Sequence, residues 1–299
     1  MLTILHISDI HFGPPFQPEV AEALLRFIQK SPTDVIVASG DFTQRAKVSQ
    51  FREARAFLDR LPPVPLVVTP GNHDVPVYRI WERMTDPYRN YRTYISAELD
   101  SVLRLDDAVI VAVNSTAPYR AVTNGRIHRW QLDFIARAFE GVPDDVRRIV
   151  VAHHHFAPPP DFEGAKPMQG AKRALGMLEA MRVDLILGGH LHRAYIGNSL
   201  DVYPGRDRRH GVVIAQSGTT TSRRGRARER EKNSFNVIRI DGEKIRITHH
   251  MYFHQPDAFL PISQHVFFRR GKPPLGVSAS TEENVFHFVD EARGLTRGG

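Results

Sequence analysis

The amino-acid sequence predicts an α/β fold in which two β-sheets pack face to face and helices cover them from outside. Three features of the chain lead to this prediction. Short apolar runs alternate with amphipathic stretches in the first part, further short apolar runs fill the second part, and polar side chains directly follow several runs. Alternating strands and helices are typical of a layered α/β sheet, whose ligand sites form at the carboxyl ends of strands.

The first part of the chain contains three expected strands and two expected helices. Short apolar runs predict buried strands at Thr3–Ser8, Asp34–Ser39 and Val64–Thr69. Between them, Pro18–Lys30 and Lys47–Leu61 carry apolar residues at helical spacing. This order favours a sheet whose strands are joined by crossover helices.

The second part is richer in strands. A polar stretch at Tyr78–Ile95 is expected to be helical, and a hairpin of Ser101–Leu105 and Ala108–Val113 follows it. Two amphipathic helices are expected at Arg129–Phe139 and about Gly170–Met181. The remaining expected strands are Arg148–Ala152, Val183–Leu187, Val212–Gln216, Phe235–Ile240 and Lys244–Met251. So many short strands indicate a second sheet.

The last part of the chain differs in composition. With no internal repeat and no earlier linker, residues 1–255 are predicted to form one domain, and residues 256–299 an appendage. Prolines punctuate the start of this appendage, and Thr281 opens a short expected helix. Three roles stay open for it: packing on the domain, covering the site, or forming a homodimer.

Composition narrows the classes of site and partner. The 299 residues include no cysteine, so disulfides, thiolate catalysis and cysteine zinc sites are excluded, and any metal must be held by His, Asp, Glu or Asn. No apolar run reaches the length of roughly 18 residues that spans a membrane. The first residues lack the pattern of a signal peptide, so we expect a cytoplasmic protein.

The net charge of +7 is concentrated in one segment. Residues 206–232 contain nine Lys or Arg and three acidic residues. Such a segment could neutralise the phosphates of nucleic acid. The simpler interpretation is a solvated loop between Thr221 and Ser234, because no aromatic residue is interleaved there to stack on bases.

Metal-binding residue types follow the ends of five expected strands. They are Asp9 and His11, Asp41, Asn72 with His73 and Asp74, His153, and His190 with His192. Residues two apart on an extended segment point the same way, and one carboxylate can bridge two cations. Mixed imidazole and carboxylate donors suit Zn, Fe or Mn. Each motif alone is commonly a turn or a surface feature, but five in order predict one metal centre.

The ordered motifs D-x-H, G-D, G-N-H-D, H and G-H-x-H resemble those of the calcineurin-like metallophosphoesterase superfamily over about residues 1–250. Two further segments, GDFTQRA at 40–46 and GRIHRWQLDFI at 125–135, resemble the bacterial class III cyclic-nucleotide phosphodiesterases. The second of them comes after Asn114 and Ser115 at a strand end. The resemblance implies a four-layer αββα sandwich, two mixed β-sheets flanked by helices, with the metals at the strand ends.

The resemblance also implies a ligand set for two transition-metal ions, Mn, Fe or Zn. One ion is bound by Asp9, His11, Asp41 and His192. The other is bound by Asp41, Asn72, His153 and His190, so that Asp41 bridges the pair. The fourth motif reads His-His-His instead of the common His-His-Pro, so His154 is an alternative to His153 as the ligand.

The same resemblance implies hydrolysis of phosphodiester bonds by a hydroxide that bridges the two metals. His73 is expected to stabilise the phosphoryl transition state or to protonate the leaving oxygen, and Asn72 to contact the substrate with it. Asp74 either orients His73 or caps the next helix. Arg45 could reach a phosphate oxygen or be solvated.

Three functions remain for comparison with the structure. The first is hydrolysis of a small phosphodiester such as a cyclic nucleotide, which follows from the resemblance around GDFTQRA and Asn114. The second is a nuclease of the same superfamily that uses the basic segment 206–232. The third, a non-catalytic metal-binding scaffold, is disfavoured because the ligand set is complete.

Overall fold

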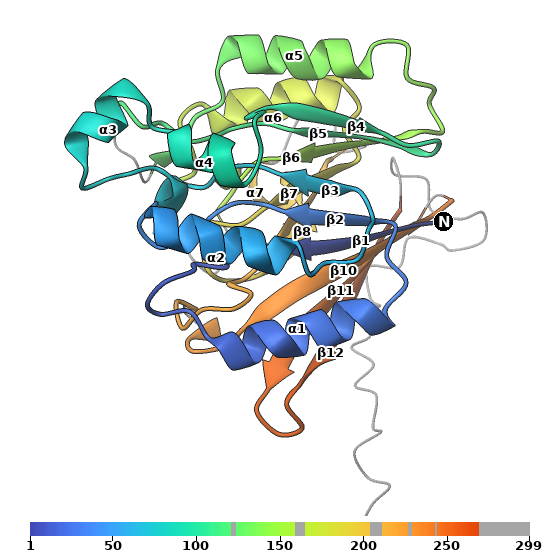
Figure 1. The fold of residues 1–299 in the computed structure, drawn as a ribbon. Coiled ribbons are helices and arrows are strands. Elements are labelled where there is room, and N and C mark those ends of the chain that lie inside the picture. Colours follow the sequence, from blue (N-terminus) through green and yellow to red (C-terminus); the bar gives the residue numbers. More distant parts are fainter. Residues whose placement is uncertain (121–123, 159–164, 204–210, 227–228, 243, 269–299) are drawn as a thin grey trace, which may run out of the picture.

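Two six-stranded β-sheets form the centre of the protein (Figure 1). The computed structural model describes residues 1–120, 124–158, 165–203, 211–226, 229–242 and 244–268. In these residues the sheets and the helices around them match the predicted αββα arrangement, so the fold class is confirmed.

The first sheet combines parallel and antiparallel strands. Its order is β12 (Ala258–Phe268), β11 (Lys244–Phe253), β10 (Ser234–Asp241), β1 (Leu2–Ile7), β2 (Val35–Ala38) and β3 (Leu66–Val68). β1, β2 and β3 are parallel, so their carboxyl ends meet at one edge. β10, β11 and β12 extend the sheet as an antiparallel meander.

The second sheet has a parallel centre and antiparallel edges. Its order is β4 (Ser101–Arg104), β5 (Ala108–Ala112), β6 (Arg147–Val151), β7 (Leu185–Gly188), β9 (Val213–Gln216) and β8 (Tyr195–Asn198). The carboxyl ends of β5, β6, β7 and β9 therefore also meet at one edge. β4 and β8 are the antiparallel edge strands.

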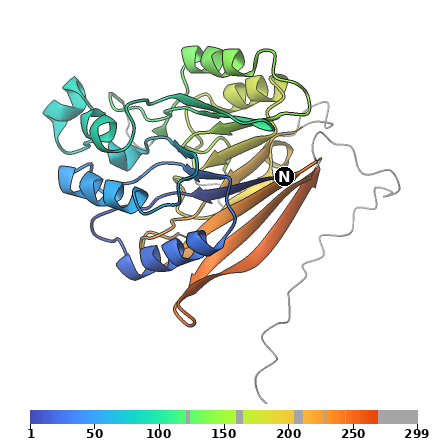
Figure 2. The same ribbon diagram turned by 45° about the vertical axis from the view of Figure 1, so that its right-hand side comes forward.

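The longer helices cover the outer faces of the sheets: α1 (Pro18–Lys30) and α2 (Val48–Leu58) the first, α5 (Arg129–Phe139) and α6 (Ala171–Ala180) the second. Three shorter helices are also described, α3 (Ile80–Thr85), α4 (Arg89–Tyr94) and α7 (Ser199–Val202). Figure 2 shows the blue helices α1 and α2 on one side of the strands, and α5 and α6, in green and yellow, on the other. A short 3-10 helix, Asn72–Asp74, follows β3.

Alternation of side chains along the strands builds three apolar layers. Along β1, Leu5 and Ile7 belong to the core under α1 and α2, whereas Leu2 and Ile4 belong to the core between the two sheets. A third core lies between the second sheet and the helices α5 and α6. Each buried Leu or Ile side chain contributes roughly 1.5–3 kcal/mol, so these layers fix the sheets and the position of their strand ends.

Most elements lie where the sequence predicts them, and the exceptions have physical reasons. α1 and α5 have the predicted bounds, and the predicted hairpin is β4 with β5. β8 was not predicted, because it is a short edge strand that contains Gly197 and is stabilised by pairing with β9. Periodicity of side chains carries little signal in such a strand.

The predicted start of the appendage at residue 256 is too early. Ala258–Phe268 is β12, which pairs antiparallel with β11 along its length. Pro261 suggested a break, but an edge strand tolerates proline, and here the register shifts next to it. The expected helix beginning at Thr281 lies outside the described residues. None of the described helices is long and apolar enough to cross a bilayer.

Candidate metal centre

The polar residues predicted at the strand ends converge on one place, where the carboxyl ends of strands from both sheets meet. Their backbone is held in an unusual conformation, because five of the nine described non-glycine residues with positive φ belong to this group. They are Asp9 (53°), His11 (56°), Asp41 (56°), His190 (73°) and His192 (54°). L-residues seldom adopt these angles, and such strain clusters at functional sites.

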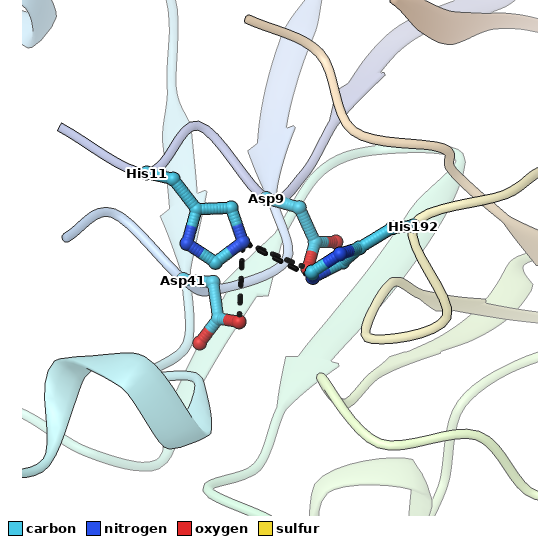
Figure 3. Close-up of side chains that lie close together, drawn as sticks. All are labelled: Asp9, His11, Asp41 and His192. Atoms are coloured by element: carbon cyan, nitrogen blue, oxygen red, sulfur yellow. Dashed lines mark hydrogen bonds and ion pairs between the residues drawn. The ribbon is translucent and has the colours of Figure 1, made fainter. Parts of the chain in front are cut away.

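Four side chains form the first ligand group, shown in Figure 3. One ligand atom of each of Asp9, His11, Asp41 and His192 lies within 4.8 Å of the others, and all four residues are buried. Nε2 of His192 lies 3.1 Å from Oδ1 of Asp9 and 3.1 Å from Nε2 of His11. Nε2 of His11 lies 3.6 Å from Oδ2 of Asp41. The group could hold one metal ion.

A second group of donors shares the same oxygen of Asp41. Oδ2 of Asp41 lies 3.4 Å from Nε2 of His153. Oδ1 of Asn72 lies 3.2 Å from that nitrogen and 2.9 Å from Nδ1 of His190. Ligands that stand about 2.1 Å from one metal are separated from each other by roughly 3.0–3.4 Å. The neighbouring donor distances given above, 2.9–3.6 Å, lie within about 0.2 Å of this range.

In each carboxylate, one oxygen accepts hydrogen bonds from the protein and the other is free to bind a metal. Oδ2 of Asp9 accepts hydrogen bonds from the Ser8 hydroxyl (2.7 Å) and from the backbone N–H of His190 (3.0 Å). Oδ1 of Asp41 accepts one from the backbone N–H of His73 (2.7 Å). The other two oxygens, Oδ1 of Asp9 and Oδ2 of Asp41, are buried and have no hydrogen-bond partner among the described residues. A metal cation would satisfy both.

Carbonyl groups orient two of the imidazoles. Nδ1 of His153 lies 2.7 Å from the carbonyl oxygen of Ser39, and Nδ1 of His192 lies 3.1 Å from that of Arg224. A carbonyl can only accept, so Nδ1 carries the proton and Nε2 keeps its lone pair for the site. Such bonds commonly fix metal-binding histidines.

Charges of opposite sign lie close together in both groups. Burial raises the pKa of Asp9, but the imidazoles of His192 and His11 outweigh it and hold that pKa well below its usual value. For Asp41, burial again opposes the shift, and His153 is the largest cause of a lowered pKa. Burial would lower the pKa of His153, yet the Asp41 carboxylate raises it to about 9. The site therefore favours bound positive charge.

A family model described as calcineurin-like phosphoesterase matches residues 2–194. The chain belongs to the calcineurin-like phosphoesterase family. The family consists of hydrolases that act on phosphoesters, and the shared-carboxylate arrangement fits a pair of metal ions. No sequence in a search of curated proteins matches the chain.

Solved structures of similar fold include a purple acid phosphatase and a dimetal phosphatase. PhoD has a TM-score of 0.69 at 11% identity, over 90% of this chain and 70% of that one. Purple acid phosphatase PPD1 of yellow lupin has a TM-score of 0.61 at 12% identity, and the match covers 90% of this chain and 54% of that protein. A dimetal phosphatase of Danio rerio has a TM-score of 0.59 at 10% identity, and the match covers 90% of this chain and 99% of that protein. At this identity the likeness concerns the fold.

Within this phosphoesterase, the geometry distinguishes between the two candidate histidines of the fourth motif. His153 faces Asp41 and Asn72. His154 turns away, and its Nδ1 lies 2.9 Å from the hydroxyl of Ser115. The Asn-Ser strand end after β5 therefore anchors the residue next to the candidate ligand.

His73 lies beside the first ligand group, and its contacts decide against one of the two roles predicted for Asp74. Its ring meets that of His11 edge-on at 4.9 Å between centroids, and its Nδ1 lies 2.8 Å from the carbonyl oxygen of Gln44. Asp74 does not orient it. The Asp74 carboxylate instead accepts hydrogen bonds from the backbone N–H groups of Phe42, Thr43 and Gly71. Asp74 thus joins two loops of the site, and the Gln44 carbonyl orients the imidazole.

Arg45 is exposed, which agrees with one of its two predicted alternatives, and a different arginine, Arg224, lies nearer the ligands. The guanidinium of Arg45 lies over the ring of Tyr78, 5.3 Å from its centroid, and no contact joins it to the ligand groups. Arg224, which the sequence analysis did not single out, lies close enough to Asp41 and Asp9 to interact with their charges. Site residues follow the ends of the other strands, and Arg224 likewise lies in the segment that follows the end of β9.

The segment after β9 is only in part the solvated loop that was predicted, because Arg223, Arg226, Arg230 and Lys232 are exposed whereas its beginning is buried. Thr219, Thr220, Thr221 and Ser222 are fully buried. The hydroxyls of Thr219 and Thr221 donate to the carbonyl oxygens of Asp9 and Ile10. These bonds tie the described part of the basic segment to the first metal-binding motif. Arg206, Arg208, Arg209 and Arg228 lie outside the described residues.

Proposed function

We propose that this calcineurin-like phosphoesterase hydrolyses small phosphodiesters at a centre of two transition-metal ions, Mn, Fe or Zn. In this proposal the first ion is bound by Asp9, His11, Asp41 and His192. The second is bound by Asp41, Asn72, His153 and His190.

One observation carries the proposal. Oδ2 of Asp41 is buried, has no hydrogen-bond partner among the described residues, and faces Nε2 of His11 at 3.6 Å and Nε2 of His153 at 3.4 Å. One oxygen thus belongs to two donor groups of four residues each. A single-metal site has no use for the second group, whereas a two-metal site needs such a bridge.

Two metal ions held by these residues would lower the pKa of a bound water and would offset the negative charge of the phosphoryl oxygens. The chain fixes the donors before the substrate arrives, because Ser8, Ser39 and the backbone N–H of His73 hold Asp9, His153 and Asp41 respectively. Groups fixed in this way need no reorganisation during the reaction.

His73 is proposed as the catalytic residue beside the metals. Its Nδ1–H donates to the Gln44 carbonyl oxygen, which leaves Nε2 as the atom that can contact a phosphoryl or leaving-group oxygen. Its backbone N–H donates to Asp41, so the loop that carries His73 is tied to the shared ligand. In this role the imidazole stabilises developing negative charge or transfers a proton. Asn72 contacts the substrate next to it. Arg45 could join them only by leaving the ring of Tyr78.

A diester substrate is supported by the segment GDFTQRA, which resembles the class III cyclic-nucleotide phosphodiesterases. Its Asp41 is the proposed bridge, and the carbonyl of its Gln44 orients His73. Monoester hydrolysis is the competing outcome, because structures of similar fold include phosphatases. The nuclease alternative rests on the basic segment, of which Arg224 lies near the ligands.

A panel assay on the manganese-loaded enzyme tests the proposal. The substrates are an aryl phosphodiester, an aryl phosphomonoester, cyclic nucleotides and single-stranded DNA. We expect hydrolysis of the diester and of a small cyclic diester, with little on the monoester. Preferential hydrolysis of the monoester would make the protein a phosphatase, and preferential cleavage of DNA would make it a nuclease. A protein with two bound metals and no hydrolysis of any ester would be a scaffold.

A further inference from the structure

Arg224 is held at the metal centre by the segment that follows β9. The backbone N–H of Thr220 donates to the carbonyl oxygen of Ser8 at 3.0 Å, and that of Arg226 donates to the carbonyl oxygen of His192 at 3.0 Å. The residues on both sides of Arg224 are therefore bonded to loops that carry ligands. These two hydrogen bonds fix the backbone of Arg224 relative to the ligand loops.

The side chain of Arg224 is half-buried, within reach of the charges of Asp41 and Asp9. One guanidinium N–H donates to Oε1 of Gln44 at 2.9 Å. Among the described residues, no carboxylate lies within ion-pair distance of the guanidinium, although the charges of Asp41 and Asp9 act on it. A guanidinium has five N–H donors, and Gln44 takes one. No other described residue accepts from its remaining donors, which an anionic ligand can therefore use.

Gln44 links Arg224 to His73. Its side-chain oxygen accepts from Arg224, and its backbone oxygen accepts from Nδ1 of His73. Its backbone N–H donates to the carbonyl oxygen of Phe12 at 2.9 Å, which fixes the residue between the two loops. One residue thus sets the positions of a permanent cation and of the proposed catalytic imidazole on the same side of the centre.

We propose that Arg224, positioned by Gln44, is a substrate-binding residue that donates hydrogen bonds to the phosphoryl oxygens of the ester. This inference rests on the proposed function and adds a phosphate-binding group to it. The planar fork of a guanidinium matches two oxygens of a phosphoryl group, and such charge-assisted bonds are among the strongest in proteins. Lysine lacks this fork, so Arg224→Lys should restore binding only in part.

The test measures the binding of inorganic phosphate and the kinetics of diester hydrolysis with manganese-loaded protein. Arg224→Gln should weaken phosphate binding and lower kcat/KM by about 10- to 100-fold, the range of a charge-assisted hydrogen bond. Gln44→Leu keeps the backbone carbonyl and should cause a smaller loss. Arg223→Gln is the matched control, because this neighbouring arginine is exposed and its guanidinium instead approaches Gln17.

Metal content separates binding of substrate from support of the ligands. We expect Arg224→Gln to keep the metal content of the wild type. Loss of metal from this variant, or phosphate binding and kinetics equal to those of Arg223→Gln, would overturn the inference. If the wild type hydrolyses no diester while phosphate binding still depends on Arg224, the proposed function fails and the binding site stands. If diester hydrolysis proceeds without dependence on Arg224, the inference alone fails.

Discussion

Replacing Gly71 with alanine should displace the carboxylate shared by the two donor groups. A Cβ added at this position would lie 2.1 Å from Oδ1 of Asp41 and 2.4 Å from its backbone nitrogen. The backbone of Gly71 has φ −102°, which any residue adopts, so the effect arises from this contact alone. Gly189→Ala should disturb one donor group only, because its added Cβ would lie 2.4 Å from Oδ2 of Asp9, which belongs to the first group alone.

The size of the displacement follows from these distances. Ordinary contact with a Cβ begins at 3.4 Å, so Oδ1 of Asp41 must move by about 1 Å, whereas metal sites tolerate roughly ±0.2 Å. The move also stretches the 2.7 Å hydrogen bond from the backbone N–H of His73. We expect Gly71→Ala to weaken binding of both metals by about 10- to 100-fold or more, and overpacking to lower the free energy of unfolding by about 1–3 kcal/mol.

Metal analysis by mass spectrometry and calorimetric titration with manganese measure the effect. We expect Gly71→Ala to lose both ions at limiting manganese and Gly189→Ala to lose one first. Gly176→Ala on α6 is the control, because no atom lies within 4 Å of its added Cβ and alanine favours a helix. Manganese affinity of Gly71→Ala within twofold of the control at both sites would refute the reasoning about Asp41.

Three further predictions concern turnover, metals and pH. Asp41→Ala should lose metal from both sites, and retention of two ions would contradict the bridging role. His73→Ala should lower turnover by about 10²- to 10⁴-fold with metal content unchanged; unchanged turnover would remove it from catalysis. Burial lowers the pKa of His249 from 6.5 to about 4, so between these values the unfolded chain binds the proton preferentially. Stability of the metal-free protein should therefore fall by about 2 kcal/mol from this group between pH 7 and pH 5. Urea unfolding of His249→Leu should show a smaller loss of unfolding free energy between pH 7 and pH 5 than the wild type shows. An equal loss in both proteins would contradict this prediction.

Strand ends were the most predictive feature of the sequence. Apolar runs locate β1, β2, β6 and β7, and the polar residues after them converge because parallel strands end at one edge. Short edge strands were less predictable. β8 and β12 depend on pairing with a neighbour, and β12 exposes Leu260, Ile262 and Val266, so neither is a buried apolar run.

Contacts between loops could not be read from sequence. Asp74 and Gln44 are both polar residues in motifs, and only the fold determines that the carbonyl of Gln44 orients His73 while Asp74 holds backbone N–H groups. The same limit applies to the arginines. Arg45 belongs to a recognisable motif and packs on Tyr78, whereas Arg224 belongs to a basic run and lies at the metal centre.

Anomalous diffraction from crystals of the manganese-loaded protein tests the central claim most directly. We predict two anomalous peaks about 3.5–4 Å apart, with Oδ2 of Asp41 between them. The first should contact Asp9, His11 and His192, and the second Asn72, His153 and His190. A single peak, or two peaks that do not share Asp41, would contradict the dinuclear centre on which the proposed chemistry depends.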